Sequence, residues 1–444
     1  MRGTTFEAWY DRLKSLLFAH RLVRVLRLNR ALHHQTLRKV RRPLKPIVLM
    51  VTTSRWFPTA RLAVALANAG CVVEAVCPEG HPISKTNAVG RTFPYGGLAP
   101  LSSIAAAIAA TKPDLLVSGD DLATWHLHSL YRKNQRAGTD GAAVCALIER
   151  SLGAAEYFGI VDDRAAFMAA AQESGVRVPK TVLLAETEQL SAAQLDFPVV
   201  LKANGTSGGV GIRVVHNAAE TQRALRSLQA PPLLARALKR ALFDHDANLL
   251  APSLLRRKSA VTAQSFIAGH EATSAVACWK GEVLASLHFD VLQKAESAGH
   301  ATVVRRIEHP EMAAGAEKMT RRLQLSGVHG FDFMLDAQTR DAYMIEINPR
   351  ATQVGHLAFG EGHDLATALA SAFTGTVVPA APRVTENDVI ALFPQEWHRD
   401  PASTFLRTGY HDVPWDQPDL KRAGEQKPQR QLLGGLARPL KPAP

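Results

Sequence analysis

The sequence predicts a protein of the α/β and α+β classes, with a parallel α/β unit followed by a larger part built on antiparallel strands. Residues 46–51 form a continuous apolar run, as in a buried parallel strand, and strands alternate with helices up to about residue 117. Residues 331–348 read as two strands joined by a polar turn. At 444 residues, the chain is long enough for two or three domains with cores of their own.

Two acidic residues follow the last expected strand of the first unit, and the sequence leaves their role open. The expected elements of this unit after the first strand are helix 61–69, strand 72–76, helix 102–111 and strand 115–117. Asp120 and Asp121 follow the last of these strands, at a carboxyl end where open α/β sheets bind ligands. The alternative, which the pattern favours slightly, is a pair of residues that caps the next helix.

The antiparallel part contains a cluster of oxygen ligands. Glu346 and Asn348 alternate onto one face of the second strand, and a hairpin would bring Asp332 opposite them, with Arg350 two residues on. Two carboxylates and an amide oxygen suit a hard divalent cation, and Mg²⁺ is typically held by one or two carboxylates plus substrate phosphates. The alternative is an ordinary hairpin whose polar face is solvated.

A glycine-rich loop lies upstream of this hairpin. An apolar strand ends at Lys202, and the loop at 205–211 then carries four glycines and two hydroxyl residues before another apolar strand. Glycines let backbone N–H groups approach phosphate oxygens, and a lysine supplies a point charge. The loop is not a Walker loop, because no Lys-Ser or Lys-Thr pair follows its glycines. By itself, it is equally compatible with a flexible hairpin.

The order of these motifs, with the lysine and glycine loop first and the carboxylate–Asn–Arg hairpin later, resembles the ATP-grasp superfamily over about residues 46–380. The resemblance implies a Rossmann-like pre-ATP-grasp domain followed by a two-lobed ATP-grasp domain. The expected divisions are a basic amphipathic extension at 1–45, the Rossmann-like domain at 46–150, a lid lobe with the glycine loop at 151–260, a metal-binding lobe at 261–380, and a C-terminal extension at 381–444 whose end is expected to be disordered.

The resemblance also implies roles for individual residues. Backbone groups of residues 265–267 would read the adenine edge, Glu271 would hold the ribose hydroxyls, and Arg350 would lie beside the transferring phosphoryl group. The implied ATP-binding residues are Arg164, Lys202, Thr206, Ser207, Gly208, Gly209, Gly211, Gln264, Ser265, Phe266, Ile267 and Glu271. The implied ligands of Mg²⁺, or Mn²⁺, are Asp332, Glu346 and Asn348, and the implied catalytic residues are Arg350 and Lys202.

An enzyme of this kind would use ATP to activate a small carboxylate as an acyl phosphate, which an amine or other nucleophile then attacks. The run Glu346-Ile347-Asn348-Pro349-Arg350 is similar to that of carbamoyl-phosphate synthetases, although only one ATP-grasp unit is present. The alternative function is an ATP-binding regulatory module without ligase turnover, recruited to a surface by the basic N-terminal helix. The filled metal-ligand positions favour the enzyme.

The charge of the chain is concentrated at its N-terminus. Residues 1–45 hold 12 Lys or Arg against two acidic residues, so +10 of the net +12 lies there, on a helical pattern with Phe6, Trp9 and Tyr10 on its apolar face. This segment is expected either to lie on an anionic membrane surface or to dock on the body or on a second subunit, which leaves a homodimer open. Basic charge alone does not indicate a nucleic-acid partner, and none is expected.

The remaining signals place the protein in the cytoplasm, with contact at the inner membrane face as the alternative for the N-terminal segment. The cysteines, Cys71, Cys77, Cys145 and Cys278, have no metal-binding spacing and are expected to be reduced thiols. No apolar run has the length of a transmembrane helix. The sequence leaves open whether Arg305 and Arg306 contact a substrate anion or form an ion pair with Glu308.

Overall fold

The computed structural model describes residues 45–186, 189–192, 194–204, 211–230, 259–295 and 299–426. The chain divides into two units, Met1–Leu44 and Lys45–Pro444, and all of the described residues belong to the second. The expectations for the N-terminal helix, for residues 205–210 of the glycine loop and for the last residues from 427 on therefore lie outside the described residues.

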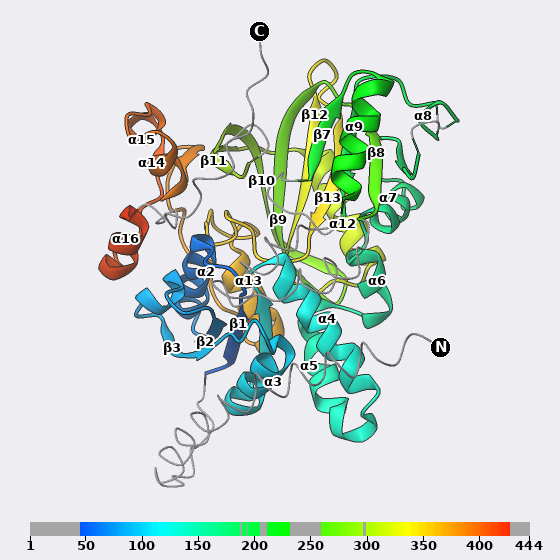
Figure 1. Ribbon diagram of the computed structural model, residues 1–444. Helices are drawn as coiled ribbons and strands as arrows, with labels where there is room; N and C mark the ends of the chain where they lie inside the picture. Colours follow the sequence, from blue (N-terminus) through cyan, green and yellow to red (C-terminus); the bar gives the residue numbers. More distant parts are fainter. Residues whose placement is uncertain are drawn as a thin grey trace, which may run out of the picture. The chain divides into compact units, whose positions relative to one another are not determined.

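The predicted parallel α/β unit is confirmed. Its sheet has the order β3-β2-β1-β4, and every neighbouring pair is parallel (Figure 1). The chain therefore moves from β1 to one side and returns to the other, which puts the topological switch point between β1 and β4. The elements are β1 (Ile47–Val51), α2 (Phe57–Asn68), β2 (Val72–Cys77), η1 (Pro82–Lys85), β3 (Val89–Pro94), α3 (Pro100–Thr111), β4 (Leu115–Ser118), α4 (Asp121–Gln135), η2 (Gly138–Gly141) and α5 (Ala142–Leu152).

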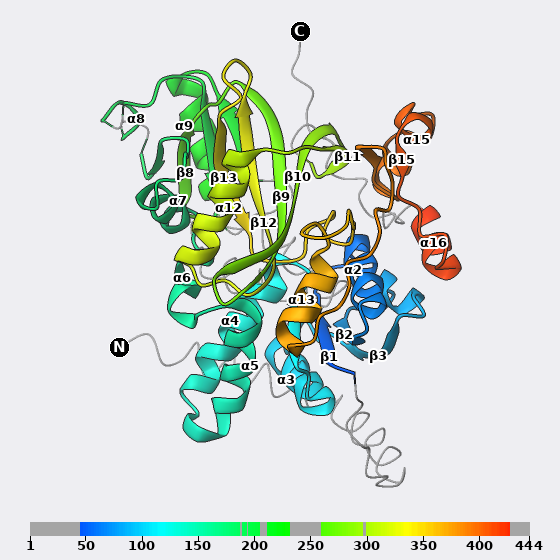
Figure 2. The same ribbon diagram turned by 180° about the vertical axis from the view of Figure 1, so that it is seen from behind.

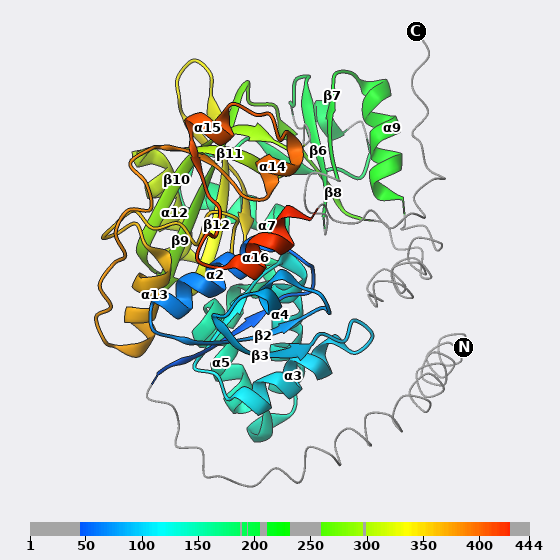
Figure 3. The same cartoon turned by 90° about the vertical axis from the view of Figure 1, so that its left-hand side faces the viewer.

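A small antiparallel sheet follows, in the order β5-β8-β6-β7, with α9 against β6 (Figure 3). Because β8 pairs with β6 over its whole length, the small sheet includes Val261–Ser265, which the expected divisions assign to the metal-binding lobe. The elements from α5 onward are η3 (Ala155–Tyr157), α6 (Phe158–Val161), α7 (Arg164–Glu173), β5 (Thr181–Leu183), α8 (Gln189–Ala192), β6 (Val199–Ala203), β7 (Ile212–Val215), α9 (Ala218–Gln229) and β8 (Val261–Ser265).

The larger sheet has the order β13-β12-β9-β10-β11-β14-β15 in the described part of the chain. Figure 2 shows α12 lying along this sheet and α13 between the sheet and the first domain, where α13 contacts α2. Its elements are β9 (Gly269–Trp279), β10 (Glu282–Lys294), β11 (Ala301–Arg306), α12 (Pro310–Arg322), β12 (Gly327–Asp336), β13 (Ala342–Asn348), α13 (Leu365–Thr374), β14 (Val389–Ala391) and β15 (Tyr410–His411).

The segment expected as a C-terminal extension from residue 381 is part of the body over its described residues. Strand β14 pairs with β11, and the remaining elements are α14 (Gln395–Arg399), α15 (Phe405–Thr408) and α16 (Pro418–Glu425). The carboxylate of Asp412 accepts a hydrogen bond from Arg61 of α2 at 2.5 Å and lies 2.7 Å from His356 Nε2. Asp412 is only 2% exposed, so this buried contact joins the segment to the first domain.

The hairpin formed by β12 and β13, called the carboxylate hairpin below, rests on a packed apolar face. Phe331 and Phe333 are buried, and Phe331 stacks on Phe167 of α7 with ring centroids 6.5 Å apart. Burying a side chain of this size contributes about 1.5–3 kcal/mol. Because side chains alternate along a strand, anchoring these phenylalanines directs Asp332 to the opposite face. Helices α7 and α12 thus fix the hairpin on which the expected metal ligands lie.

Two further expectations concern the chain as a whole. The four cysteines are free thiols, three of them buried, in agreement with the expected reduced state. Within the described residues, no helix combines the length and the apolar character needed to span a bilayer.

Candidate functional site

A cavity of about 370 Å³ lies where the small sheet, the larger sheet and the first domain meet. One end is lined by strands of the two sheets and by the carboxylate hairpin, and is called the nucleotide end below. The other end, called the far end, is lined by the loop after β1, by residues of β10, β11 and the segment between them, and by the segment after β13. The far end is formed by Trp56, Val291, Gly299, His300, Ala301, Arg350, Thr352, Gln353 and Val354.

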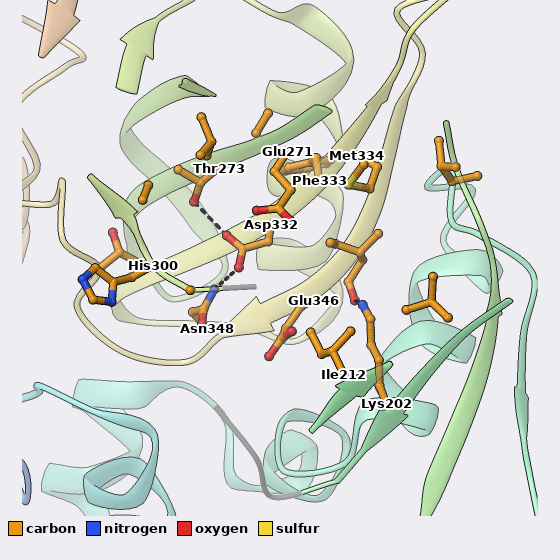
Figure 4. A pocket seen from close by; sticks show the side chains of 18 of the residues that line it. Lys202, Ile212, Glu271, Thr273, His300, Asp332, Phe333, Met334, Glu346 and Asn348 are labelled. Atoms are coloured by element: carbon orange, nitrogen blue, oxygen red, sulfur yellow. Dashed lines mark hydrogen bonds between the residues drawn. The ribbon is translucent and has the colours of Figure 1, made fainter. Parts of the chain in front are cut away.

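The structure brings the three expected metal ligands together at the centre of this cavity. Asp332 and Glu346 stand opposite each other in the register of β12 and β13. The Asn348 side-chain N–H and the Thr273 hydroxyl each donate a hydrogen bond of 2.8 Å to the Asp332 carboxylate, and Figure 4 shows Asp332 between them. Burial, reinforced by the neighbouring carboxylate of Glu346, raises the pKa of Asp332 to about 6.

This donor set fits a hard divalent cation. Two facing carboxylates in a buried place repel each other, and a cation between them would remove the repulsion that raises the pKa of Asp332. In the described part of the chain, no group of three or more His, Cys, Asp or Glu side chains could hold a metal by itself. Water or oxygens from a bound phosphate would complete the coordination of the two carboxylates, which is how Mg²⁺ is commonly held.

Two cations from the lid side approach the same carboxylates. Arg164, the first residue of α7, donates to Glu346 at 2.9 Å and to the backbone oxygen of Ala203 at 3.1 Å. Lys202 lies at the end of β6, is 4% exposed, and contacts the backbone oxygen of Ile345 at 3.4 Å. Burial lowers the pKa of Lys202 to about 8, although Glu346 acts in the opposite direction. The expected phosphate-binding pair thus contacts β13 of the carboxylate hairpin.

The expected adenine-binding segment also lines the cavity. Gln264, Ser265, Phe266, Ile267 and Glu271 are all lining residues. The backbone N–H of Ser265, the last residue of β8, donates to the Lys180 oxygen at 2.9 Å, so the expected contact with the adenine edge would use other backbone groups of residues 265–267. Glu271 is ion-paired with Lys294 at 2.7 Å.

The glycine loop can be placed only at its end. Thr206, Ser207, Gly208 and Gly209 lie outside the described residues. Gly211 is buried, and its backbone oxygen accepts a hydrogen bond of 2.9 Å from the N–H of Ala203, next to Lys202. The loop therefore leaves and rejoins the small sheet beside the buried lysine.

Arg350 is held by the first domain, which the sequence did not reveal. Its Nε donates to the Asp121 carboxylate at 2.9 Å, and its Nη2 donates to the Asn348 side-chain oxygen at 3.1 Å. Asp121 begins α4, at the carboxyl end of β4 and beside the switch point of the sheet. This position in the sequence could have indicated a role at the site, because open α/β sheets bind their ligands at the carboxyl ends of their strands. The slightly favoured interpretation as a capping pair is wrong for Asp121.

Asp120 is a cap, but it has a further role at the far end. It accepts the N-capping hydrogen bond from the N–H of Ala123 at 2.9 Å. It also accepts hydrogen bonds from the backbone N–H of Thr53 at 2.6 Å and from the Thr52 hydroxyl at 2.8 Å, in the loop after β1. That loop ends at Trp56, whose ring meets His300 edge-on at 5.1 Å. Asp120 therefore fixes the loop that forms one wall of the far end.

The two arginines of β11 do not join the cavity. Arg306 pairs with Glu308 and lies over the ring of Phe359 at 5.3 Å, as the ion-pair alternative predicted. Arg305 is exposed and is not among the cavity-lining residues of the described chain.

Comparison with known proteins agrees with this geometry. Residues 163–371 match the family described as carbamoyl-phosphate synthase L chain, ATP binding domain. The carboxyaminoimidazole ribonucleotide synthase of Aspergillus clavatus, solved with ATP, is 15% identical, with 76% of this chain and 78% of that chain covered and a TM-score of 0.54.

Two further solved structures are similar to the same extent. The biotin carboxylase domain of the 2-oxoglutarate carboxylase of Hydrogenobacter thermophilus, solved with MgADP, ADP and bicarbonate, is 16% identical over 74% of this chain and 69% of that chain, with a TM-score of 0.51. The L-amino acid ligase of Bacillus licheniformis is 14% identical over 76% of each chain, with a TM-score of 0.50. At these identities, the likeness establishes the fold.

Fold, motif order and family match thus agree with one another. Residues 163–371 match the ATP-binding domain of the carbamoyl-phosphate synthase L chain, and the described chain shares the fold of the three solved structures.

Proposed function

We propose that this protein is a Mg²⁺-dependent ligase that uses ATP to activate a carboxylate as an acyl phosphate, which an amine or another nucleophile attacks to form a C–N or similar bond. One observation carries the proposal. Asp332 and Glu346 face each other across the carboxylate hairpin, and two cations, Arg164 and Lys202, approach the same point from the lid side. Oxygen ligands for a cation and the basic group of Lys202 therefore line one cavity, and Arg164 contacts the cavity-lining Glu346.

The roles of the residues follow from their positions. Lys202 and Arg164 would bind the α- and β-phosphates, and Arg164 would exchange its contact with Glu346 for a phosphate oxygen. Asp332, Glu346 and Asn348 would hold Mg²⁺, or Mn²⁺, which when bound neutralises charge on the phosphates and on the incoming carboxylate. No side chain needs to act as a nucleophile, because this chemistry depends on positioning and on compensation of charge.

The nucleotide end suits the remainder of ATP. Val200, Ile212 and Met334 provide apolar walls for a flat base, and residues 266 and 267 carry backbone groups for its edge. Glu271 would accept hydrogen bonds from the ribose hydroxyls. The sequence of residues 205–210 carries three glycines, a residue type that suits close contact between backbone N–H groups and phosphate oxygens.

The names of the similar structures support the substrate class. One is a biotin carboxylase domain solved with bicarbonate, one is an amino acid ligase, and one is a synthase solved with ATP. Bicarbonate and an amino acid, which two of these names contain, support a carboxylate or bicarbonate as the group that this chain activates.

The proposal is tested by measuring release of ADP and phosphate from MgATP with a panel of small carboxylates, including bicarbonate and amino acids, each paired with a panel of amines. We expect one pairing to raise phosphate release well above the background, with a ligated product identified by mass spectrometry. Tight MgATP binding without stimulation by any pairing would favour the alternative, an ATP-binding regulatory module.

The basic N-terminal extension supports a separate proposal about location. Residues 1–45 carry +10, and each basic side chain near an anionic surface is worth about 1 kcal/mol, so this segment would hold the enzyme on an anionic membrane. Deleting residues 1–42 should abolish sedimentation with anionic liposomes at low salt and leave MgATP binding unchanged. A full-length protein that ignores such liposomes would contradict the membrane role, and a change of oligomeric state on deletion would favour a homodimer contact.

A further inference from the structure

The turn between β4 and α4 holds the backbone on both sides of Arg350. The backbone N–H of Ala351 donates to the oxygen of Ser118 at 2.9 Å, and the hydroxyl of Thr124 donates to the oxygen of Pro349 at 2.6 Å. Ser118 and Thr124 are buried, at 3% and 2% exposure. The Cα position of Arg350 is therefore set by the first domain through contacts that do not involve the Arg350 side chain.

Asp121 acts on the side chain alone. It receives the Nε–H of Arg350 at 2.9 Å, while the Nη1 and Nη2 groups contact the Ala351 oxygen at 3.2 Å and the Asn348 side chain at 3.1 Å. A guanidinium has five N–H groups in one rigid plane. Three contacts along different edges fix that plane, and the remaining N–H groups can bind an anion only in the direction that the plane allows.

The same contacts connect the first domain with the metal ligands. Asp121 binds Arg350, Arg350 binds Asn348, and Asn348 in turn binds Asp332 at 2.8 Å. Asp121 lies 229 residues before Arg350 in the sequence, so the connection exists only in the folded protein. It places a charged, oriented group next to the carboxylate hairpin, at the border between the nucleotide end and the far end.

We propose that Asp121 is a positioning residue, which orients the guanidinium of Arg350 toward the phosphoryl group as it is transferred. This inference rests on the proposed ligase function. Asp121 touches neither the phosphoryl group nor the metal, so it acts only through Arg350. The charge of Arg350 would then contribute mainly when negative charge spreads over the transferring group, and less when ADP alone is bound.

If Asp121 instead neutralised the charge of Arg350, its removal would have a different effect on anion binding. If Asp121 mainly neutralised Arg350, removing its charge would strengthen the binding of any anion beside Arg350. If it positions Arg350, replacing it by alanine should weaken binding of the transition-state mimic, whereas asparagine, which keeps a side-chain oxygen for the Nε–H, should preserve it. The two variants therefore separate position from charge.

The test uses the full-length protein and two probes, MgADP alone and MgADP with aluminium fluoride, a mimic of the phosphoryl group in flight. Calorimetry gives the affinity for each, and their ratio gives the enhancement by aluminium fluoride. We expect Asp121→Ala to keep the MgADP affinity within twofold and to reduce the enhancement about tenfold. Asp121→Asn should keep the enhancement within about threefold.

The chain offers a matched control for the loss of a first-turn helix carboxylate. Asp419 lies in the first turn of α16, is 66% exposed and pairs with Arg422, outside the cavity. Asp419→Ala should leave both affinities unchanged. Undiminished or increased enhancement in Asp121→Ala would overturn the positioning role, as would equal loss in the alanine and asparagine variants. A wild-type protein that binds MgADP without any enhancement would instead overturn the ligase function, and the role of Asp121 with it.

Discussion

The two ends of the cavity are built in different ways. At the nucleotide end, the central acidic residues lie on the two strands of one hairpin, and Asp332 and Asn348 are only 16 residues apart in the sequence. At the far end, Arg350 meets Asp121 across 229 residues, and Trp56 meets His300 from a different domain. The first geometry follows from strand alternation, whereas the second exists only after the domains have docked.

The two ends also differ in how well neighbouring protein groups balance their charges. At the nucleotide end, the half-buried carboxylates of Asp332 and Glu346 face each other, and Lys202 is a buried lysine with a lowered pKa. At the far end, Asp120 accepts several hydrogen bonds from the loop after β1, and Arg350 is paired with Asp121. A bound cation and phosphates would thus balance charges at the nucleotide end, whereas the charges at the far end are already paired within the protein.

The largest effect should come from the carboxylate hairpin. Glu346→Gln keeps the size of the side chain and a hydrogen-bond acceptor for Arg164, but removes a charge from the expected metal site. We expect the fold to be retained, as judged by circular dichroism, and ATP turnover with the cognate substrates to fall at least about 100-fold. Glu317→Gln, on an exposed ion pair of α12, is the control. Normal Mg²⁺-dependent turnover in Glu346→Gln would remove Glu346 from the metal site.

This difference between the ends explains what the sequence could predict. The facing positions of Asp332, Glu346 and Asn348 follow from the two-residue period of strands and a short turn, so local reasoning places them together. The buried apolar strand at 46–51 predicts β1 for the same reason. Contacts between neighbouring strands of a hairpin need no knowledge of how domains dock.

The features that the sequence did not predict are contacts that depend on tertiary packing. Asp121 was interpreted as a cap because capping is a local pattern, whereas its partner Arg350 lies in another domain. Strand β14 has three residues, too few for a periodic signal, so its addition to the larger sheet was missed. Residues 261–265 have the sequence Val-Thr-Ala-Gln-Ser, which does not indicate whether β8 pairs with the small or the larger sheet.

The next effect concerns the buried lysine of the nucleotide end. Lys202→Ala removes a charge-assisted phosphate contact, which is worth about 1.5–3 kcal/mol, so the affinity for MgADP should fall about 10- to 150-fold. Lys318→Ala, at an exposed position of α12, should have no effect. Isothermal titration calorimetry measures both. Unchanged affinity in Lys202→Ala would show that this lysine supports the small sheet rather than a phosphate.

The same lysine should give the nucleotide end a pH dependence at alkaline pH. The pKa of Lys202 is lowered to about 8, so the charged form prevails below that pH and is lost as the pH rises through it. MgADP affinity should therefore decrease above about pH 8. Lys202→Arg, whose guanidinium stays charged, should remove that decrease. An equal decrease in both proteins would assign the dependence to another group.

A smaller effect is expected on the acidic side. A bound cation needs Asp332 deprotonated, and its raised pKa of about 6 means that protons compete below that value. The affinity for Mn²⁺, followed by electron paramagnetic resonance without nucleotide, should rise with pH by up to about tenfold per unit up to pH 6 and then level off. Asp332→Asn should bind Mn²⁺ weakly and lose most of this pH dependence. A flat wild-type profile would contradict a metal at Asp332.

The smallest effect should come from the far end, and it tests whether the two ends are independent. Trp56 lines the far end, and its indole Nε1 is buried without a hydrogen-bond partner in the described part of the chain. Trp56→Phe therefore removes no hydrogen bond and keeps an aromatic ring against His300.

Because the loop before Trp56 is fixed by Asp120 and no nucleotide contact is expected there, the MgADP affinity of Trp56→Phe should stay within about twofold of the wild type. Substrate-stimulated phosphate release should change instead, through the Michaelis constant of the carboxylate or amine. If the variant weakens MgADP about as strongly as Lys202→Ala does, the two ends are energetically coupled, and the far end cannot be a rigid wall that is independent of the nucleotide.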